Sequence, residues 1–352
     1  MVRLVISFLL ILITFVASAQ SVVTDTVANM PQNSLLSSGR WFKIKIDTSG
    51  VYRLTYDELL KIGLDNPAET RIFSYGGRTL PLFCGEPVLD DLNEIPTLKM
   101  SGDDGIFGSG DQLIFYVQGP VVLNYDREKD VFSHSRHNYS DYVYLFLTSD
   151  LGLGMSMAIA QPDSMVITDT IKSYDGYAYF GREKYNLISS GLRWYDNRLA
   201  ANTIDSVQFH FRNIVETEPV KCLALSAGRM VNGTSSAYFR YRYNGQDVAT
   251  RDIVRSYNDY LYADFCEKLF SFNVGSSNFY LAYGLSSSNV STLGYIYKIC
   301  VNAREWLSYS GKRQMHFRDS RTSTADAIVF KIDNNGNEPM VADITNPVNP
   351  FL

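Results

Sequence analysis

The stretch from Ser38 to Asp65 reads SGRWFKIKIDTSGVYRLTYDELLKIGLD and carries more structural information than any other part of the chain. Residues 42–46 read FKIKI, so that apolar side chains alternate with lysines, as in a strand with one buried face. Asp-Thr-Ser-Gly at 47–50 predicts a turn, in which Gly50 is expected to take a positive φ. Residues 51–54 then return as a second strand. The stretch therefore predicts a β-hairpin.

A short helix is predicted directly after this hairpin. Thr55 is suited to cap the first turn, and Glu58 stands three residues later, as a capping box requires. Gly63 is placed to end the helix. The side chains expected to face the interior are Leu59, Leu60 and Ile62.

The first 19 residues have the features of a secretory signal peptide. Arg3 supplies a positive charge, residues 4–16 are apolar, and Ala17-Ser18-Ala19 is a small-residue cleavage site. This apolar run is shorter than the roughly 20 residues that a membrane-spanning helix needs. We therefore expect the chain to be exported.

The composition of the chain limits the kinds of partner it could bind and the number of domains it could form. The formal net charge is −5 and no block of basic residues is present, which argues against nucleic acid and against anionic lipid as partners. A chain of 352 residues is long enough for about two domains and buries a core that needs no disulfides. The 24 Tyr and 20 Phe suit strands, where cross-strand aromatic pairs are common.

The four cysteines are dispersed and form no C-x-x-C pair, so that a zinc site has little support. An exported protein is able to form disulfides. The strand-like surroundings of Cys222 in VKCLAL and of Cys300 in YKICV favour buried free thiols instead. The other two cysteines are Cys84 and Cys266.

Short strand-like runs separated by turn residues fill most of the chain. In the second half, runs such as SVQFHF, VKCLAL and AYFRYRY recur with Gly, Asn and Ser between them. Such spacing is typical of a β-sandwich or jelly roll. Helical patterns are weak except at 55–62 and 303–309. The sequence predicts a mostly β protein with two consecutive β-domains, the second a jelly-roll-like β-sandwich, and one short helix near residues 55–62.

The opening stretch also resembles a known family. Its pattern is similar to the mature N-terminus of the sortase of the type IX secretion system, a gingipain-type cysteine peptidase of Bacteroidetes. The residues that fill the family pattern are Trp41, Lys43, Ile44, Gly50, Val51, Tyr52, Leu54, Thr55, Tyr56, Asp57, Leu59 and Gly63. Further resembling segments lie at 102–119, 137–148, 181–199, 294–309 and 341–350.

The resemblance implies a division of the chain and a function. It covers the non-catalytic N-terminal region of the family, whose catalytic Cys and His would lie downstream, so that no catalytic residue is carried over and no enzyme activity is expected of this chain. The implied ranges are a signal peptide at 1–19, a leader at 20–37, a β-domain at 38–160, a β-sandwich at 165–335 and a connection towards a peptidase domain at 336–352.

The family removes C-terminal signals from secreted cargo and attaches the cargo to the cell surface. The resemblance implies a scaffold or docking role, with an outer-membrane β-barrel or other secretion-system components as partners. The implied location is the periplasm or the cell surface, associated with the outer membrane. The alternatives are a carbohydrate-binding β-sandwich, which predicts a cluster of exposed Trp or Tyr, and a structural β module without a ligand.

Three carboxylates, Asp103, Asp104 and Asp111, lie on a Gly-rich turn whose oxygens could hold calcium. The other interpretation is an acidic, solvated turn. His134 and His137 are spaced for zinc or copper but lack a third ligand nearby, and His210 in VQFHFRN has the context of an ordinary strand residue. The sequence contains neither a Gly-x-Ser-x-Gly elbow nor a phosphate loop.

Overall fold

The structure is a computed structural model that describes residues 33–77, 79–81, 83, 85–86, 89–160, 169–230, 236–254, 261–321 and 328–352. The predicted signal peptide and Cys84 lie outside these residues. The described chain is mostly β, which confirms the predicted fold class. Its α-helix is α2, and single turns of 3₁₀ helix include Leu35–Ser37 and Pro67–Glu69.

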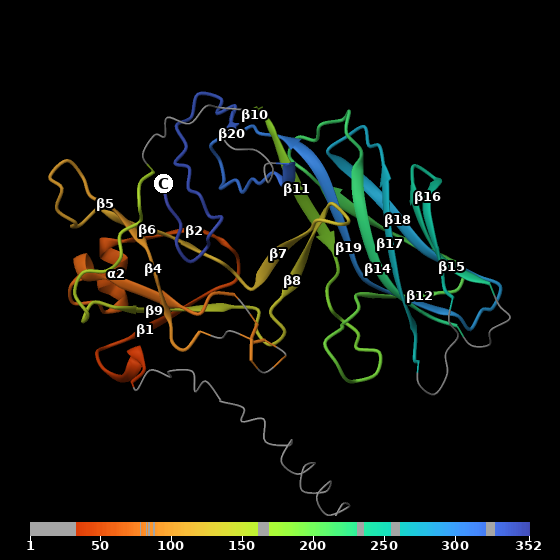
Figure 1. Cartoon of the computed structure of the whole chain (residues 1–352), viewed down its shortest axis with the longest axis horizontal. Coiled ribbons are helices and arrows are strands. Elements are labelled where there is room, and N and C mark those ends of the chain that lie inside the picture. The colour runs from red at the N-terminus through yellow and green to blue at the C-terminus, as the bar shows by residue number, and fades with distance from the viewer. Residues whose placement is uncertain are drawn as a thin grey trace, which may run out of the picture.

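The N-terminal unit consists of two antiparallel sheets packed face to face (Figure 1). One sheet has the order β1-β9-β3-β4 and the other β2-β6-β5. Apolar side chains from both sheets and from α2 form one core, which includes Leu59, Ile72, Phe115 and Leu145. The strands are β1 (Phe42–Ile46), β2 (Gly50–Thr55), β3 (Arg71–Ser74), β4 (Asn93–Ile95), β5 (Thr97–Met100), β6 (Gln112–Val117) and β9 (Val143–Thr148).

Helix α2 (Tyr56–Ile62) begins and ends as predicted. The Thr55 hydroxyl accepts from the Glu58 N–H, and the Glu58 carboxylate accepts from the Thr55 N–H, which completes the capping box. Gly63 ends the helix with a φ of 112°. One detail of the prediction was wrong: Leu60 is 45% exposed, because Leu59 and the flanking turn already fill the core side of so short a helix.

In the described residues, the sandwich consists of nine strands in two sheets. The first sheet has the order β11-β19-β14-β17, with β12 paired to β19 beside β11, and the second has the order β13-β18-β15-β16. The strands are β11 (Ser173–Phe180), β12 (Asn197–Ala200), β13 (Thr203–His210), β14 (Val220–Arg229), β15 (Ala237–Tyr243), β16 (Gln246–Asp252), β17 (Asp264–Phe272), β18 (Asn278–Ser287) and β19 (Leu293–Trp306).

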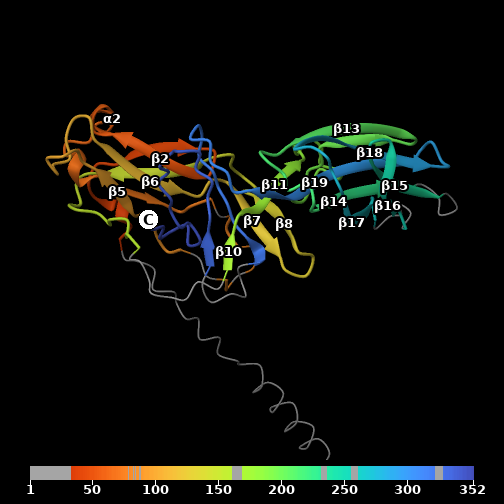
Figure 2. The same cartoon turned by 90° about the horizontal axis from the view of Figure 1, so that it is seen from above.

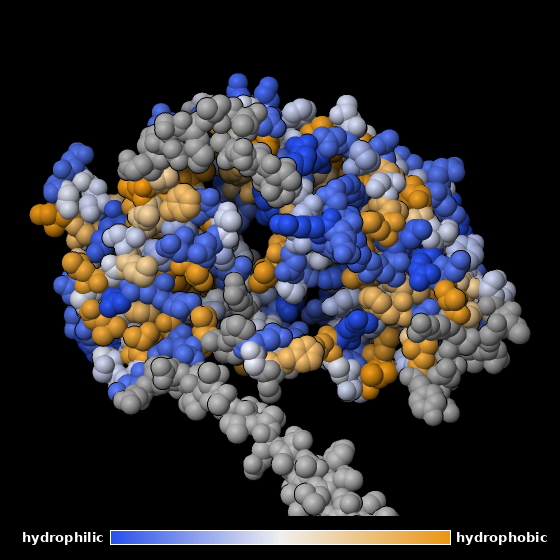
Figure 3. Space-filling model, viewed as in Figure 1, coloured by the Kyte–Doolittle hydropathy of each residue, from blue (hydrophilic) through white to orange (hydrophobic). Residues whose placement is uncertain are grey.

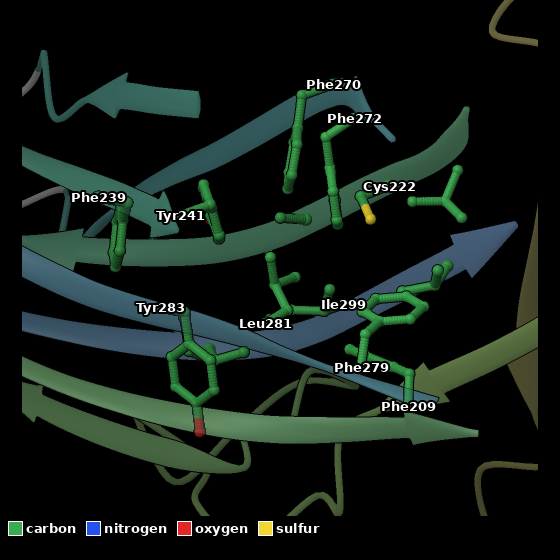
Figure 4. Close-up of a cluster of buried hydrophobic side chains, with 14 of the residues drawn as sticks. Phe209, Cys222, Phe239, Tyr241, Phe270, Phe272, Phe279, Leu281, Tyr283 and Ile299 are labelled. Carbon is green, nitrogen blue, oxygen red and sulfur yellow. The ribbon is translucent and has the colours of Figure 1, made fainter. Parts of the chain in front are cut away.

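The connections of the sandwich are those of a jelly roll. Strands β12, β19, β14 and β17 face β13, β18, β15 and β16, and apart from the β15–β16 hairpin each consecutive strand from β12 onward crosses to the other sheet. The core between the sheets is rich in aromatic rings, such as Phe239, Tyr241 and Phe279 (Figure 4). The predicted jelly-roll-like sandwich is therefore observed.

Residues 303–309, one of the two segments with a helical pattern in the sequence, are not helical. Strand β19 continues through Trp306, and its last residues pair with β11, with Ala303 opposite Gly176 and Trp306 opposite Ser173. A backbone ladder with a neighbouring strand outweighs a local helical preference, because that preference amounts to a few tenths of a kcal/mol per residue.

After β19, the chain returns to the N-terminal unit as the return segment, residues 307–321 and 328–352, drawn in dark blue in Figure 1. Strand β20 (Ile328–Phe330) pairs in parallel with β10 (Asp169–Ile171). The backbone of Leu352 pairs with residues 158–160 at the end of the N-terminal unit. Within the described residues, no helix is long and apolar enough to cross a membrane.

Strands β7 (Val121–Asp126) and β8 (Val131–Arg136) form a separate hairpin, named here the junction hairpin. It leaves the N-terminal unit after β6 and lies between that unit and the sandwich in both views (Figure 2). Its position makes it the main element that joins the two β units.

Candidate functional site

The junction hairpin packs on the outer face of the first sandwich sheet. Val131 is 1% exposed and lies in an apolar cluster with Leu223, Leu225 and Cys300 from β14 and β19. Three partly buried rings pack against this cluster: Tyr177, Phe265 and Tyr297. Beside the hairpin, the face in Figure 3 is hollowed between the two units. The hairpin therefore buries apolar surface that the sandwich alone would expose.

Asn302 fixes the position of this hairpin. Its Oδ1 accepts a hydrogen bond from the Phe132 N–H at 2.7 Å, and its Nδ2 donates to the Phe132 carbonyl at 3.1 Å. The Asn302 amide thus bonds both the N–H and the carbonyl of Phe132, as the backbone of a neighbouring strand would. Because Asn302 is 8% exposed, loss of either bond would leave a polar group away from water.

A second amide makes the same kind of contact at the other side of the junction. Gln314 in the return segment accepts from the Val51 N–H at 2.8 Å and donates to the Val51 carbonyl. Gly50 does not have the positive φ expected of it. It opens β2, and a Cβ there would lie 3.0 Å from the Gln314 Oε1, so that the glycine makes room for the amide. The return segment is thus bonded to the N-terminal unit.

His134 lies at the centre of the junction. Its Nδ1 is 2.6 Å from the Tyr177 hydroxyl, its carbonyl accepts from the Lys298 Nζ, and its ring lies 4.0 Å from that of Tyr179. Burial lowers the pKa of His134 to about 4, with the charges of Lys298 and Arg136 acting in the same direction. The imidazole is therefore neutral at neutral pH.

The Tyr177 hydroxyl in turn donates to the Cys300 thiol at 3.2 Å, which links a His to a Cys through a Tyr. Burial raises the pKa of the Cys300 thiol, and it raises the pKa of Tyr177 as well. Cysteine nucleophiles act as thiolates, and a protonated, buried thiol lacks that reactivity. This cluster is suited to holding the hairpin in place and not to attacking a peptide bond.

Two ion pairs lie at the tip of the hairpin. Lys221 of β14 pairs with Asp130, and Lys129 pairs with Glu267 of β17 at 2.7 Å. All four side chains are a third to a half exposed, so each pair contributes little to stability. They orient the hairpin over the sheet.

The predicted calcium ligands lie together on one turn, where two of the three accept hydrogen bonds from the backbone. The Asp111 carboxylate accepts from the N–H groups of Gly102 and Gly108, and Asp104 accepts from the Ile106 N–H. Asp103 is exposed. In the part of the chain that the structure describes, no group of three or more His, Cys, Asp or Glu side chains is arranged to hold a metal. The calcium site stays a prediction.

The remaining predicted residues lie apart. His137 accepts from the backbone N–H groups of Tyr139 and Ser140, and the exposed His210 bonds the Asn278 side chain. The cysteines that the structure describes, Cys222, Cys266 and Cys300, are buried free thiols on strands.

A shallow, open depression of about 500 Å³ lies on the loop that joins β11 to β12. Tyr185 and Trp194 contribute two aromatic rings to it, which are 49% and 45% exposed. The remaining residues that line it are Lys184, Asn186, Ser189, Ser190 and Gly191. This loop carries the green colour of Figure 1, below the sandwich.

The junction hairpin was missed at the level of sequence, although a signal was present. The alternating runs VVLNYD and VFSHSR flank a polar turn, in which Asp126 accepts from the N–H groups of Glu128 and Lys129. Asn302 carries no such signal, because its partner is 170 residues away in the sequence.

The fold and the junction define a β protein of two joined units, one of them a jelly roll. Neither a family model nor a curated protein matches the sequence. Among solved structures, the chain is similar to dimeric latent PorU from Porphyromonas gingivalis, with 26% identity and a TM-score of 0.71. PorU is a type IX sortase, so the resemblance inferred from the sequence is confirmed, and the structure is that of a PorU-like N-terminal region.

The match with PorU covers 84% of this chain and 26% of the PorU chain, so the present chain spans about a quarter of that protein. A second similar structure is the Cry8Ea1 δ-endotoxin of Bacillus thuringiensis, with 7% identity, 67% and 42% of the two chains covered, and a TM-score of 0.26. The VP2 subviral particle of infectious bursal disease virus follows at 11% identity, 76% of each chain and a TM-score of 0.21.

Proposed function

We propose that the chain is the non-catalytic β scaffold of a type IX sortase-like protein and presents docking surfaces to other secretion components. The observation that carries this proposal is the similarity to PorU over 84% of the chain. The protein as a whole would remove C-terminal signals from secreted cargo and attach the cargo to the surface. Its partners would include an outer-membrane β-barrel, and its location would be the periplasm or the cell surface, associated with the outer membrane.

The geometry of the junction supports a scaffold. Asn302 bonds Phe132 of the hairpin, and Gln314 bonds Val51 of the N-terminal unit, so that two separate amides connect the β units. The buried contact around Val131 adds apolar surface to this connection. A scaffold that docks partners on both units requires such a fixed relation between them.

We propose that the three described cysteines are not catalytic nucleophiles. The environment of Cys300 keeps its thiol protonated, and the pKa values of the Cys222 and Cys266 thiols are raised by burial. We propose that this chain positions cargo or partners and does not cut peptide bonds.

The test is an in-frame deletion of residues 38–352 in the organism that encodes the chain, followed by immunoblots of a type IX cargo. Cargo that retains its C-terminal signal should accumulate, and wild-type protein supplied from a plasmid should restore processing. Unchanged processing after the deletion would contradict the proposal.

A second function, carbohydrate binding, is favoured by one specific observation. That function requires a cluster of exposed Trp or Tyr, and Tyr185 and Trp194 form such a cluster in the depression on the β11–β12 loop. It is compatible with the scaffold role, because this loop lies away from the bonds that Asn302 and Gln314 make.

A further inference from the structure

We propose that the depression lined by residues 184–194 binds a saccharide, with Trp194 and Tyr185 as stacking platforms. The inference rests on the carbohydrate-binding function proposed above and is independent of the sortase-like role. Sugar rings present apolar C–H faces and polar hydroxyl edges, so they are bound by flat aromatic rings combined with nearby hydrogen-bonding groups. Both kinds of group line this depression.

Two aromatic side chains of the depression are accessible to a ligand. Trp194 and Tyr185 both line it and are close to half exposed. The adjoining Tyr195 is 6% exposed and exchanges backbone hydrogen bonds with Tyr185, from N–H to carbonyl in both directions at 2.7 Å. This isolated bridge keeps the two strands of the loop together at the base of the depression.

The loop is fixed from within by the Asn186 side chain. Its Oδ1 accepts from the N–H groups of Ile188 and Ser190, and its Nδ2 donates to the Gly191 carbonyl. Ser189 takes a φ of 55° and Gly191 a φ of 81° to allow this turn. A preformed loop loses little conformational entropy when it binds a ligand.

Two further anchors hold the loop on the sandwich. Arg193 lies 4.1 Å from the centroid of the Phe265 ring, and Leu187 packs against a buried cluster that includes Tyr295. Asp196 is fully buried at the end of the loop and accepts from Arg182, with Lys184 3.3 Å away. Arg182 and Lys184 share the single negative charge of Asp196, which offsets part of the positive charge beside the depression.

The depression also offers hydroxyl groups that can form hydrogen bonds with a sugar. In the part of the chain that the structure describes, the hydroxyls of Ser189 and Ser190 make no hydrogen bond to protein, and both residues are exposed at the rim. The volume of about 500 Å³ lies in the range of about 300–1,000 Å³ that small-molecule sites occupy. The open shape suits one end or a short stretch of a longer glycan.

The experiment is isothermal titration of the full chain with four soluble hexaoses: cellohexaose, mannohexaose, xylohexaose and chitohexaose. We expect at least one to bind with a Kd of about 1 mM or tighter. Trp194→Ala should weaken that binding at least about tenfold. Trp306→Ala is the matched control, because Trp306 is also 45% exposed but lies at the end of β19, and it should bind like wild type.

A second variant separates the site from effects on folding. Ser189→Ala combined with Ser190→Ala leaves both rings in place and should weaken binding about threefold to tenfold, with an unchanged melting temperature. The proposal is overturned if no hexaose binds the wild-type chain, as expected of a protein-docking loop. Equal binding by wild type and Trp194→Ala would overturn it as well.

Discussion

The side-chain amide of Asn302 bonds both backbone groups of Phe132, which lies 170 residues earlier in the chain. Asn302 stands on β19 of the sandwich and Phe132 on the junction hairpin. One buried side chain therefore completes the hydrogen bonding of a strand in the hairpin that joins the two β units. The stability of the junction depends on this contact more than on the ion pairs at the hairpin tip, which remain partly exposed.

Replacement of Asn302 by Ala should destabilise the protein. The change leaves the N–H and the carbonyl of Phe132 without partners, and we expect a loss of about 2–4 kcal/mol in the free energy of unfolding. Denaturant unfolding followed by tryptophan fluorescence measures this loss. The control is Asn278→Ala, an exposed Asn that bonds His210, for which we expect less than about 0.5 kcal/mol. Equal losses in the two variants would disprove a special role for Asn302.

The stability of the protein should decrease as the pH is lowered from about 6.5 to 4, because of His134. The folded pKa of about 4 lies below the ordinary value of 6.5, so between these pH values only the unfolded state binds the proton. This contribution is constant above about pH 6.5, declines as pH falls and levels off near pH 4, for a total of about 3 kcal/mol. Unfolding curves of His134→Gln should show a weaker pH dependence than those of the wild type. The same slope in both proteins would contradict this account.

The three buried thiols should resist alkylation in the native protein. Burial raises the pKa of Cys266 to about 11 and raises the pKa values of Cys222 and Cys300 as well, so that little thiolate forms near neutral pH. In a Cys84→Ser background, mass spectrometry should find almost no carbamidomethyl label after native treatment and three labels after treatment in concentrated guanidinium chloride. Rapid native labelling, or a disulfide among these residues, would argue against the described burial.

The acidic turn should depend on Asp111 much more than on Asp103. The Asp111 carboxylate accepts two backbone N–H bonds, so Asp111→Ala should cost about 1–2 kcal/mol, whereas the exposed Asp103→Ala should cost less than about 0.5 kcal/mol. Since the oxygens of Asp111 and one oxygen of Asp104 already accept backbone hydrogen bonds, we expect the same melting temperature in calcium and in EDTA. A rise with calcium that Asp111→Ala abolishes would instead establish the calcium site.

Local patterns in the sequence predicted the local structure well. The alternation around Ile44, the capping box at Thr55 and the stop at Gly63 each depend on residues within a few positions, and each was found. The jelly roll followed from the regular recurrence of strands and turns. Leu60 was mispredicted because Leu59 and the flanking turn already fill the core side of the short helix. The helical pattern at 303–309 is overridden by pairing with a distant strand.

The sites were much harder to predict than the fold. The hydrogen bonds made by the side-chain amides of Asn302 and Gln314 join residues that are 170 and 263 positions apart in the sequence. No periodic pattern in the sequence marks either residue. The depression at Trp194 depends on the way Asn186 folds the loop, and the sequence showed only that the chain is rich in aromatic residues. Long-range side-chain bonds and loop conformations are set by the finished fold.

The most direct test of the scaffold role is cargo processing in cells whose chromosomal copy carries Asn302→Ala, compared with Asn278→Ala and wild type at equal protein levels. If the chain acts as a joined scaffold, cargo that retains its C-terminal signal should accumulate in the Asn302→Ala cells alone. Normal processing in those cells, with the junction shown to be destabilised in the purified variant, would contradict the proposed role.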